Sequence, residues 1–545
     1  MTGGAGVTRA AAGMGVATAA SRMIGFARIL VIAAVLGTTY LGNTYQSSNA
    51  VSNVLFELLA AGALSAVLVP TFVAHLDRDD QREAERLAGR LLGIALLVLG
   101  GVAVVGILAA PWIAALLTTG VTNPHIAEQQ RELSTFLLRF FIPQILLYAI
   151  GAVAVAVLYA KRKLAVTALA PIGLTVVIVA TMGIFRVVAG PSPGLDLTTG
   201  EKLVLALGGT LGVVAFVAIP TVALWRTGFR LVPRLGTHDA AVGRVLRLSG
   251  WAVFQHSMIG LLLLAAIVVG NTVEGGTLAY QVAWVFFLAP YAVLAQPIHT
   301  AILPDLSRQS HEPDDFNRSL QWALDAMAVL VVPVSAALVA LALPIMQVAA
   351  FGQATRSGGV GLLAAGLASL AVGLYTYSVF LLFARAYYAL GDSRTPAVVA
   401  LASALAGIAI MVVGAAVTSG RTTVAFLGLG HSVAYAVGAV ALWIGLARRT
   451  GRLVVPSSLG RSVLVAAPLA VGGWALTRAV DPTSRIGTLL LVVGIVVVGG
   501  AAYVFGLRAL GGTPTLHPAP PSGRPGTRAA APGGPEGPTP IESTP

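Results

Sequence analysis

The 545-residue chain is 57% hydrophobic and only 10% charged. Soluble domains carry about 25% charged residues, so this composition excludes an ordinary water-soluble fold and indicates a membrane protein. The net charge of +13 does not indicate a nucleic-acid partner, because the basic residues lie in short turns between apolar stretches. The chain has no cysteine, which excludes disulfides and thiolate metal sites.

Apolar stretches of about 20 residues or more, long enough to cross a bilayer, follow one another along the chain. They predict an all-α polytopic membrane protein with about fourteen transmembrane helices. The stretches lie at about 10–38, 44–74, 89–117, 133–158, 164–189, 202–225, 244–271, 277–304, 321–343, 360–388, 395–417, 424–446, 460–480 and 485–507.

The basic residues predict the orientation of these helices. With residues 1–9 in the cytoplasm, most arginines and all but one of the lysines fall in cytoplasmic loops, as the positive-inside rule requires. We therefore expect a multi-pass protein of the bacterial cytoplasmic membrane with both termini cytoplasmic. Residues 512–545 are rich in Pro, Gly, Ser and Thr and are expected to form a disordered cytoplasmic tail.

Two halves of the chain resemble each other at an offset of about 230 residues. Pro70 and Pro304 end similar apolar segments before a charged turn, and Tyr159 and Tyr388 precede similar polar turns. We interpret this as a parallel repeat, which places a substrate site between two lobes. The expected domains are a first lobe at 10–230, a second at 231–450 and two further helices at 451–511; chance recurrence of prolines and basic turns is the alternative.

Two arginines lie inside the first predicted span. Arg22 and Arg28 are flanked by apolar residues on both sides, and an arginine at the bilayer centre costs at least ~2.5–3.5 kcal/mol. Guanidinium is a fork-shaped donor suited to phosphate, so we expect both to bind an anionic substrate. Gly25 between them would permit a bend. Alternatively the arginines reach the two membrane surfaces, or pair with Glu57.

Further polar residues at membrane depth are weaker candidates for the same substrate site, since each alone is more often an interhelical hydrogen-bonding residue. They are Asn43, Asn53, Glu57, Gln281 and Arg385. No Ser/His/Asp set, metal-spaced histidine cluster or phosphate-binding loop appears. We therefore expect no enzymatic activity, no cofactor and no metal.

Several motifs resemble the MurJ/MviN family of lipid II flippases, which belongs to the multidrug/oligosaccharidyl-lipid/polysaccharide exporter superfamily. The similar segments are residues 21–28 (SRMIGFAR), Gly37, Asn53, 60–64 (AAGAL), 69–70 (VP), 302–307 (ILPDLS) and 386–396 (AYYALGDSRTP). The resemblance covers the fourteen-span body. It implies two six-helix lobes in a V shape with two extra C-terminal helices.

The resemblance also implies a function. Family members carry lipid II, the lipid-linked peptidoglycan precursor, from the inner to the outer leaflet by alternating access for cell-wall synthesis. Arg22 and Arg28 match the family arginines that contact the pyrophosphate. The expected partners are lipid II or a similar polyprenyl-pyrophosphate glycan, membrane lipids and cell-wall synthesis proteins.

The chain departs from the family pattern at several cavity positions. Phe56 and Val285 stand where the family has arginines, and Asn43 stands where it has an acidic residue. Either Arg385, Arg139 or a polar residue compensates, or the substrate or mechanism has changed. The alternatives are therefore export of another polyprenyl-linked polysaccharide precursor, or a non-transporting scaffold for cell-wall proteins.

Overall fold

The computed structural model describes residues 24–56, 72, 80–161, 163–234, 240–356 and 358–511. Every regular element within these ranges is helical, which confirms the predicted fold class. Eleven helices are long and apolar enough to cross a membrane, and a twelfth span results if the bent pair α15 and α16 is counted as one. Since the first two expected spans lie partly outside the described ranges, the total of fourteen stays a prediction.

The first half of the chain begins with an apolar helix at Ile24–Leu36. It continues with α2 (Tyr40–Phe56), α4 (Gln81–Leu108), α5 (Ala110–Leu117), α6 (Pro124–Phe141), α7 (Gln144–Ala160), α8 (Leu164–Val188) and α9 (Thr199–Trp225). Prolines mark two breaks inside stretches that look continuous in the sequence: Pro111 opens α5, and Pro143 precedes α7. Proline suits the first turn of a helix because its missing N–H would have no partner there.

The second half contains the remaining helices. They are α10 (Ala240–Gly270), α11 (Gly276–Pro290), the π-helical turn η2 (Tyr291–Ala295), α12 (Gln296–Arg308), α13 (Pro313–Ala340), α14 (Ala342–Ala349), the 3₁₀ turn η3 (Gly352–Thr355), α15 (Gly359–Val372), α16 (Leu374–Ala389), α17 (Arg394–Val417), α18 (Gly420–Thr450), α19 (Leu459–Val480) and α20 (Arg485–Ala509). The pair α15 and α16 bends by 47°. At the bend Gly373 packs against α18, where a Cβ would lie 2.5 Å from the Ser432 hydroxyl oxygen.

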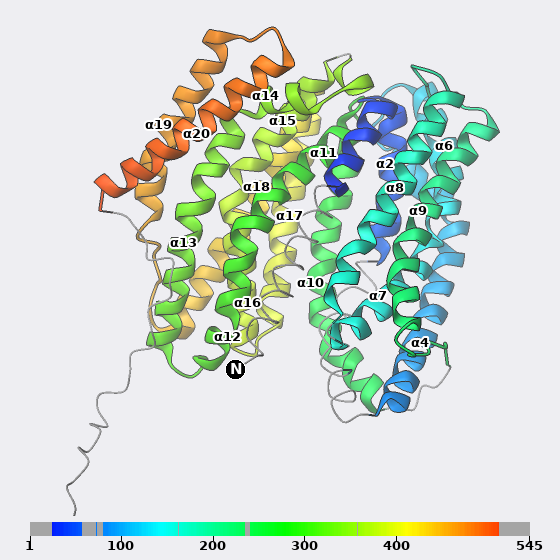
Figure 1. The fold of residues 1–545 in the computed structure, drawn as a ribbon, viewed down its shortest axis with the longest axis horizontal. Helices are drawn as coiled ribbons and strands as arrows, with labels where there is room; N and C mark the ends of the chain where they lie inside the picture. Colours follow the sequence, from blue (N-terminus) through cyan, green and yellow to red (C-terminus); the bar gives the residue numbers. More distant parts are fainter. Residues whose placement is uncertain are drawn as a thin grey trace, which may run out of the picture.

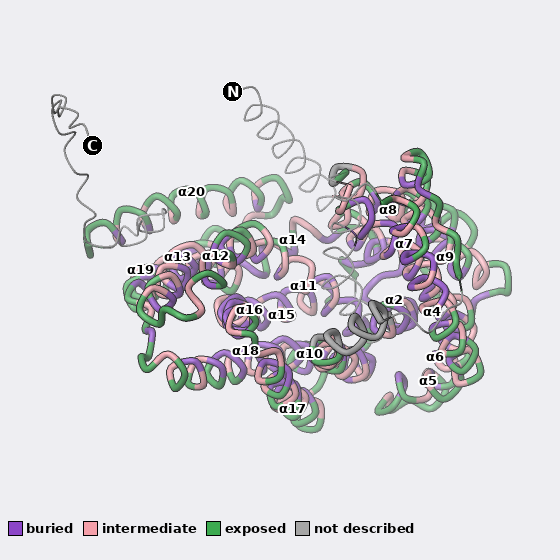
Figure 2. Tube along the Cα trace, turned by 90° about the horizontal axis from the view of Figure 1, so that it is seen from below, coloured by how far each residue is buried: buried purple, intermediate pink, exposed green. Residues whose placement is uncertain are grey.

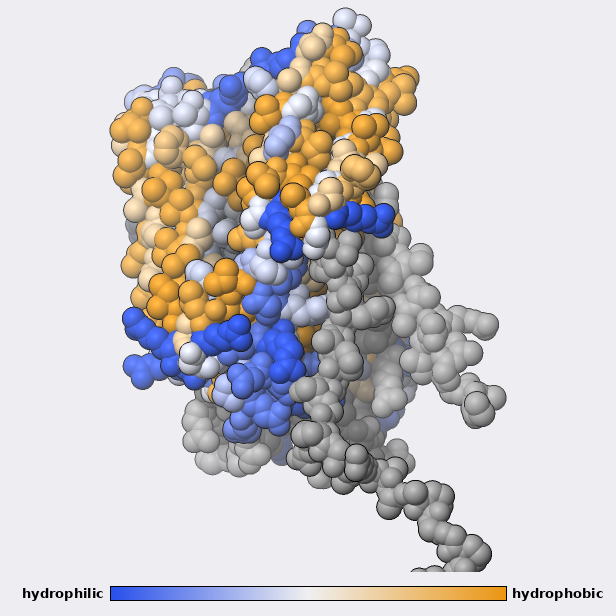
Figure 3. All heavy atoms as spheres, turned by 90° about the vertical axis from the view of Figure 1, so that its left-hand side faces the viewer, coloured by the Kyte–Doolittle hydropathy of each residue, from blue (hydrophilic) through white to orange (hydrophobic). Residues whose placement is uncertain are grey.

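The helices form two groups that approach each other at one end (Figure 1). One group contains α2 and α4–α9, the other contains α11–α18, and α10 lies between them (Figure 1). Helices α19 and α20 pack on the second group, on the side away from the first. Only 6% of the most apolar window of each is buried, and α20 is largely exposed in Figure 2. Figure 3 shows a broad hydrophobic surface over this face, as expected for helices surrounded by lipid.

Asn43, at the start of α2, joins the two groups at the end where they approach, here called the closed end. Its Nδ2 donates to the Val273 carbonyl at 2.7 Å. Its Oδ1 accepts from the backbone N–H groups of Thr277 and Leu278 at 3.0 and 3.3 Å. These N–H groups lie in the first turn of α11, where Gly275 provides no side-chain cap. Asn43 therefore caps a helix of the opposite group.

A second contact at the closed end joins the loop before α9 to the segment around η3. Gln353 Nε2 donates to the Pro191 carbonyl and to the Ser192 hydroxyl, the latter at 3.1 Å. Arg356 Nη1 donates to the same hydroxyl at 2.6 Å. These bonds connect segments about 160 residues apart in the sequence, so they fix the two groups relative to each other.

Thr38 fills the space between these contacts. It is buried, and a Cβ on Gly275 or Gly359 of the second group would lie 2.4 or 2.2 Å from its atoms. Gly275 also has a φ of 73°, which favours glycine. The closed end therefore depends on close backbone approach as well as on hydrogen bonds.

At the opposite end of the bundle, Asp392 organises the turn between α16 and α17. Its carboxylate accepts from the Thr395 N–H at 2.9 Å and hydroxyl at 2.6 Å, and from the Arg449 guanidinium. Burial raises the pKa of the Asp392 carboxyl, but the Thr395 hydrogen bonds and Arg449 outweigh burial. The pKa of this carboxyl therefore lies below its ordinary value.

Candidate functional site

A cavity of about 410 Å³ lies between the two groups of helices. It receives side chains from the helix at Ile24–Leu36 and from α2, α7, α8, α9, α10 and α11. The lining residues are Arg28, Ile29, Ile32, Tyr45, Gln46, Asn49, Ala50, Asn53, Tyr148, Leu174, Ile178, Gly209, Val213, Phe216, Leu263, Tyr280, Gln281, Trp284 and Val285. A cavity of this size, mostly apolar with a few polar groups, is typical of a ligand site.

Arg28 is the one charged side chain among the described residues that line this cavity. It lies eight residues before Leu36 at the closed end of its helix, or about 12 Å at 1.5 Å per residue. None of the described lining residues is a carboxylate, so Arg28 has no counter-charge among the described residues of the cavity. Such a charge in a low-dielectric region favours an anionic ligand.

Amide side chains from both groups line the same cavity as Arg28. Gln46, Asn49 and Asn53 come from α2, where their spacing places them on one helical face. Gln281 comes from α11 of the opposite group, and its Nε2 donates to the backbone carbonyl of Gln46 at 3.5 Å. The cavity therefore combines one cation with neutral donors and acceptors suited to hydroxyl, amide and phosphate oxygen atoms.

Aromatic residues form the wall of the cavity on the side of the second group. Tyr280 and Trp284 lie one turn apart on α11, and both line the cavity. Behind them His431 is buried, with its Nε2 2.6 Å from the Tyr280 hydroxyl and its Nδ1 3.2 Å from the Tyr435 hydroxyl. These bonds hold the orientation of Tyr280.

Four aromatic residues line the cavity without having been predicted from the sequence: Tyr45, Tyr148, Tyr280 and Trp284. Aromatic residues in apolar helices are usually packing residues, and only the arrangement of helices from both halves brings them together. The i, i+4 spacing of Tyr280 and Trp284, beside Gln281, is the one local signal of a shared helical face.

The predicted site residues fall into three sets. Arg28, Asn53 and Gln281 line the cavity. Asn43 lies outside it, buried at the closed end, and Arg385 lies on α16 and is not among the lining residues. Arg22 and Glu57 lie outside the described residues.

Gly25 lies in the helix at Ile24–Leu36, one turn before Arg28. A Cβ built at this position would have no atom within 4 Å, so close helix packing does not require a glycine here.

The structure describes the side chain at one of the two positions, Phe56 and Val285, where the resembling family has arginines. Val285 lines the cavity, so its apolar side chain stands where a cation would face the ligand. The side chain of Phe56 lies outside the described part of the chain. Arg139 is exposed in the last turn of α6 and does not line the cavity.

Comparisons with known proteins agree with this architecture. The family model described as "Lipid II flippase MurJ" matches residues 32–494. A probable lipid II flippase MurJ of Vibrio cholerae is 25% identical over 390 residues, covering 70% of this chain and 72% of the relative. A probable lipid II flippase MurJ of Rhizobium tropici is 25% identical over 511 residues, covering 90% and 92%.

Two solved structures share the fold. One is a lipid II flippase MurJ in an inward closed conformation, with a TM-score of 0.70 at 18% identity, covering 91% of this chain and 99% of that one. The other is an inward-facing multidrug resistance MATE transporter, with a TM-score of 0.62 at 13% identity, covering 80% and 98%. The family model matches most of the chain. The chain therefore belongs to the lipid II flippase MurJ family, a family of integral membrane transport proteins.

Proposed function

We propose that this protein translocates lipid II, the lipid-linked peptidoglycan precursor, from the inner to the outer leaflet of the bacterial cytoplasmic membrane. The observation that supports this most directly is the half-buried Arg28 in a cavity between the two groups whose described lining contains no carboxylate. Lipid II carries a diphosphate between its polyprenyl chain and its sugars, and a guanidinium binds phosphate oxygens through charge-assisted hydrogen bonds.

In the proposed cycle the diphosphate binds Arg28, and the polar head group contacts the amides of Asn53 and Gln281. Trp284 and Tyr280 offer aromatic faces to the sugar rings. Arg22 and Glu57 are proposed to act near the same cavity, with Gly25 permitting a bend between Arg22 and Arg28. The polyprenyl chain stays in the bilayer, where it needs no protein polar groups.

Alternating access requires the closed end to separate while the other end closes. We propose that Asn43 acts in this step rather than at the substrate, because its hydrogen bonds join α2 to α11 across the two groups. Arg385 on α16 is proposed to contact the anion only in another conformation. An inside-negative potential favours outward movement of the anionic head group, at ~2.3 kcal/mol per charge per 100 mV.

The proposed orientation places the closed end outside and both termini in the cytoplasm. The basic turns support it, since Lys161, Lys163, Arg448 and Arg449 lie at the end opposite to the closed end. In this orientation we expect substrate to enter the cavity from the inner leaflet. The two lobes at 10–230 and 231–450 are proposed to move relative to each other around it.

The test is transport of fluorescent lipid II in vesicles that contain the purified protein. A membrane-impermeant reductant bleaches only lipid in the outer leaflet, so the bleached fraction reports translocation. We expect Arg28→Ala to slow translocation roughly tenfold or more, since a hydrogen bond to a charged group contributes about 1.5–3 kcal/mol. Arg28→Lys keeps the charge but loses the fork-shaped pair of donors, so its translocation rate should fall between those of Arg28→Ala and the unchanged protein.

Arg139→Ala is the matched control, because Arg139 is exposed and lies outside the cavity. It should translocate lipid II at the rate of the unchanged protein. A full rate in Arg28→Ala vesicles, with normal protein incorporation, would contradict the proposed role of the cavity.

A further inference from the structure

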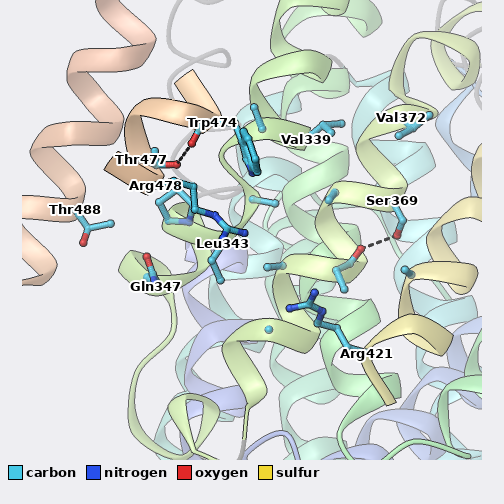
Figure 4. Close-up of a pocket in the computed structure, with 18 of the residues that line it drawn as sticks. Val339, Leu343, Gln347, Ser369, Val372, Arg421, Trp474, Thr477, Arg478 and Thr488 are labelled. Atoms are coloured by element: carbon cyan, nitrogen blue, oxygen red, sulfur yellow. Dashed lines mark hydrogen bonds between the residues drawn. The ribbon is translucent and has the colours of Figure 1, made fainter. Parts of the chain in front are cut away.

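A second cavity, of about 540 Å³, opens at the closed end where α14, α15 and α18 meet α19 and α20 (Figure 4). It lies away from the Arg28 cavity, and no residue lines both. The polar residues in its lining include two arginines, three threonines, Gln347, Ser369 and Asp481. Nothing in the proposed translocation uses it.

Arg421 and Arg478 extend toward the same space from opposite walls of this cavity (Figure 4). Arg421 comes from the first turn of α18, and Arg478 from the last turn of α19. Neither forms an ion pair with a described residue. Since Asp481 is the one carboxylate among the described lining residues, these residues give the cavity a net positive charge.

The charge of Arg421 does not stabilise the helix that carries it. The first turn of α18 has no acidic residue, and a cation there adds to the positive end of the helix dipole. An anion between the two guanidinium groups would remove this repulsion and could accept hydrogen bonds from both.

The depth of the cavity corresponds to the lipid head groups. Trp474, one turn before Arg478, is exposed, and the Arg478 guanidinium lies 5.4 Å from its ring centroid. Tryptophan is enriched at the boundary between hydrocarbon and water. Helix α19 ends two residues after Arg478, at Val480, which also places this site at the membrane surface.

An apolar groove of about 480 Å³ continues from the cavity toward the membrane interior, between α13, α19 and α20. Ala340 lines both spaces, so they adjoin. The groove is lined by aliphatic residues and by Tyr503, whose hydroxyl is occupied because it donates to the Val329 carbonyl at 3.0 Å. A cationic cavity above an apolar groove has the polarity of a lipid.

We propose that Arg421 and Arg478 bind the phosphate of a lipid head group in the leaflet at the closed end, with its hydrocarbon chain in the apolar groove. The shared chemistry is a phosphate on a hydrophobic anchor, supplied either by an anionic phospholipid or by a polyprenyl diphosphate that has crossed the membrane. The bound lipid connects α18 to α19 and so attaches the last two helices to the second group. This site does not depend on the proposed transport.

The test measures lipid binding to the purified full chain by native mass spectrometry in detergent. The lipids are phosphatidylglycerol, a polyprenyl diphosphate, and uncharged diacylglycerol, which has chains but no phosphate. The variant Arg421→Gln/Arg478→Gln should raise the dissociation constant for phosphatidylglycerol, polyprenyl diphosphate or both about tenfold or more, and each single variant several-fold. Diacylglycerol should bind weakly to all proteins.

Arg485→Gln is the matched control, because Arg485 is an exposed arginine at the start of α20 that does not line the cavity. It should bind both phosphate lipids like the unchanged chain. The lipid whose affinity falls more in the double variant identifies the source of the phosphate. Equal affinities in the double variant and the control, or diacylglycerol binding as tight as phosphatidylglycerol, would overturn the proposal.

If the double variant is poorly folded, the single variants decide, with melting temperature measured for each. Because this assay contains no translocation step, its failure leaves the proposed transport function untouched. Conversely, loss of transport in Arg28→Ala vesicles would not change the lipid binding measured here.

Discussion

Replacement of Asn43 by alanine should open the closed end. The substitution removes three hydrogen bonds, to Val273, Thr277 and Leu278, and leaves two N–H groups of α11 without a cap. A typical hydrogen bond contributes about 0.5–1.5 kcal/mol net, and unsatisfied buried groups cost about 1–3 kcal/mol each. A shift of about 3 kcal/mol toward a conformation with the closed end separated corresponds to roughly 100-fold in population.

Cysteine labelling measures this shift directly, because the natural chain has no cysteine. Thr38 is buried between the two groups at the closed end, so Thr38→Cys should react slowly with a maleimide that cannot cross membranes. We expect Asn43→Ala to raise that labelling rate by one to two orders of magnitude.

Ser47→Ala is the control for this experiment. Ser47 is also buried on α2, but its hydroxyl donates only to carbonyls of its own helix, Asn43 at 2.7 Å and Thr44 at 3.3 Å. Its labelling rate should stay near that of the parent. If Asn43→Ala labels no faster than Ser47→Ala, while both melt at similar temperatures, the capping contact does not hold the closed end together.

Two further predictions concern stability, measured as melting temperature in detergent. Gly93→Ala should lower the melting temperature, because the added Cβ would lie 2.1 Å from the Arg234 carbonyl oxygen. Gly100→Ala on the same helix meets no atom within 4 Å and should leave the melting temperature unchanged or raise it. Equal shifts in the two variants would refute the packing argument. Asp392→Asn should lower the melting temperature at pH 7, because a carboxyl with a lowered pKa stabilises the fold above its ordinary pKa of about 3.9. That difference should disappear as the pH falls through the lowered value, and a difference that persists in acid would contradict the assignment.

The sequence predicts the position of most helices because long apolar runs end at charged or turn-forming residues. The stretch expected at 164–189 is α8, Leu164–Val188, and the stretch expected at 460–480 is α19, Leu459–Val480. Breaks within apolar runs are harder to predict, as at α4 and α5, because hydropathy does not change where the helix axis does. The short helix α14, Ala342–Ala349, lies mostly between the expected stretches 321–343 and 360–388.

The residues of the candidate site can be predicted only partly from the sequence. Arg28 stands out because a cation in an apolar stretch is costly, and the structure places it in the cavity. The capping role of Asn43 depends on the register between two helices 230 residues apart, which no local pattern determines. Arg421 and Arg478 look like ordinary residues of outer loops until the fold brings the start of α18 and the end of α19 to the same cavity.

Helices α19 and α20 are the least buried of the described membrane spans, although they pack on α13 and α14. Only 6% of the most apolar window of each helix is buried, so their tilt should respond to the thickness of the surrounding hydrocarbon. A thinner bilayer would therefore reorient this pair while leaving the tightly packed helices around Arg28 unchanged. The choice of detergent or synthetic lipid should therefore change the orientation of α19 and α20 more than that of the helices around Arg28.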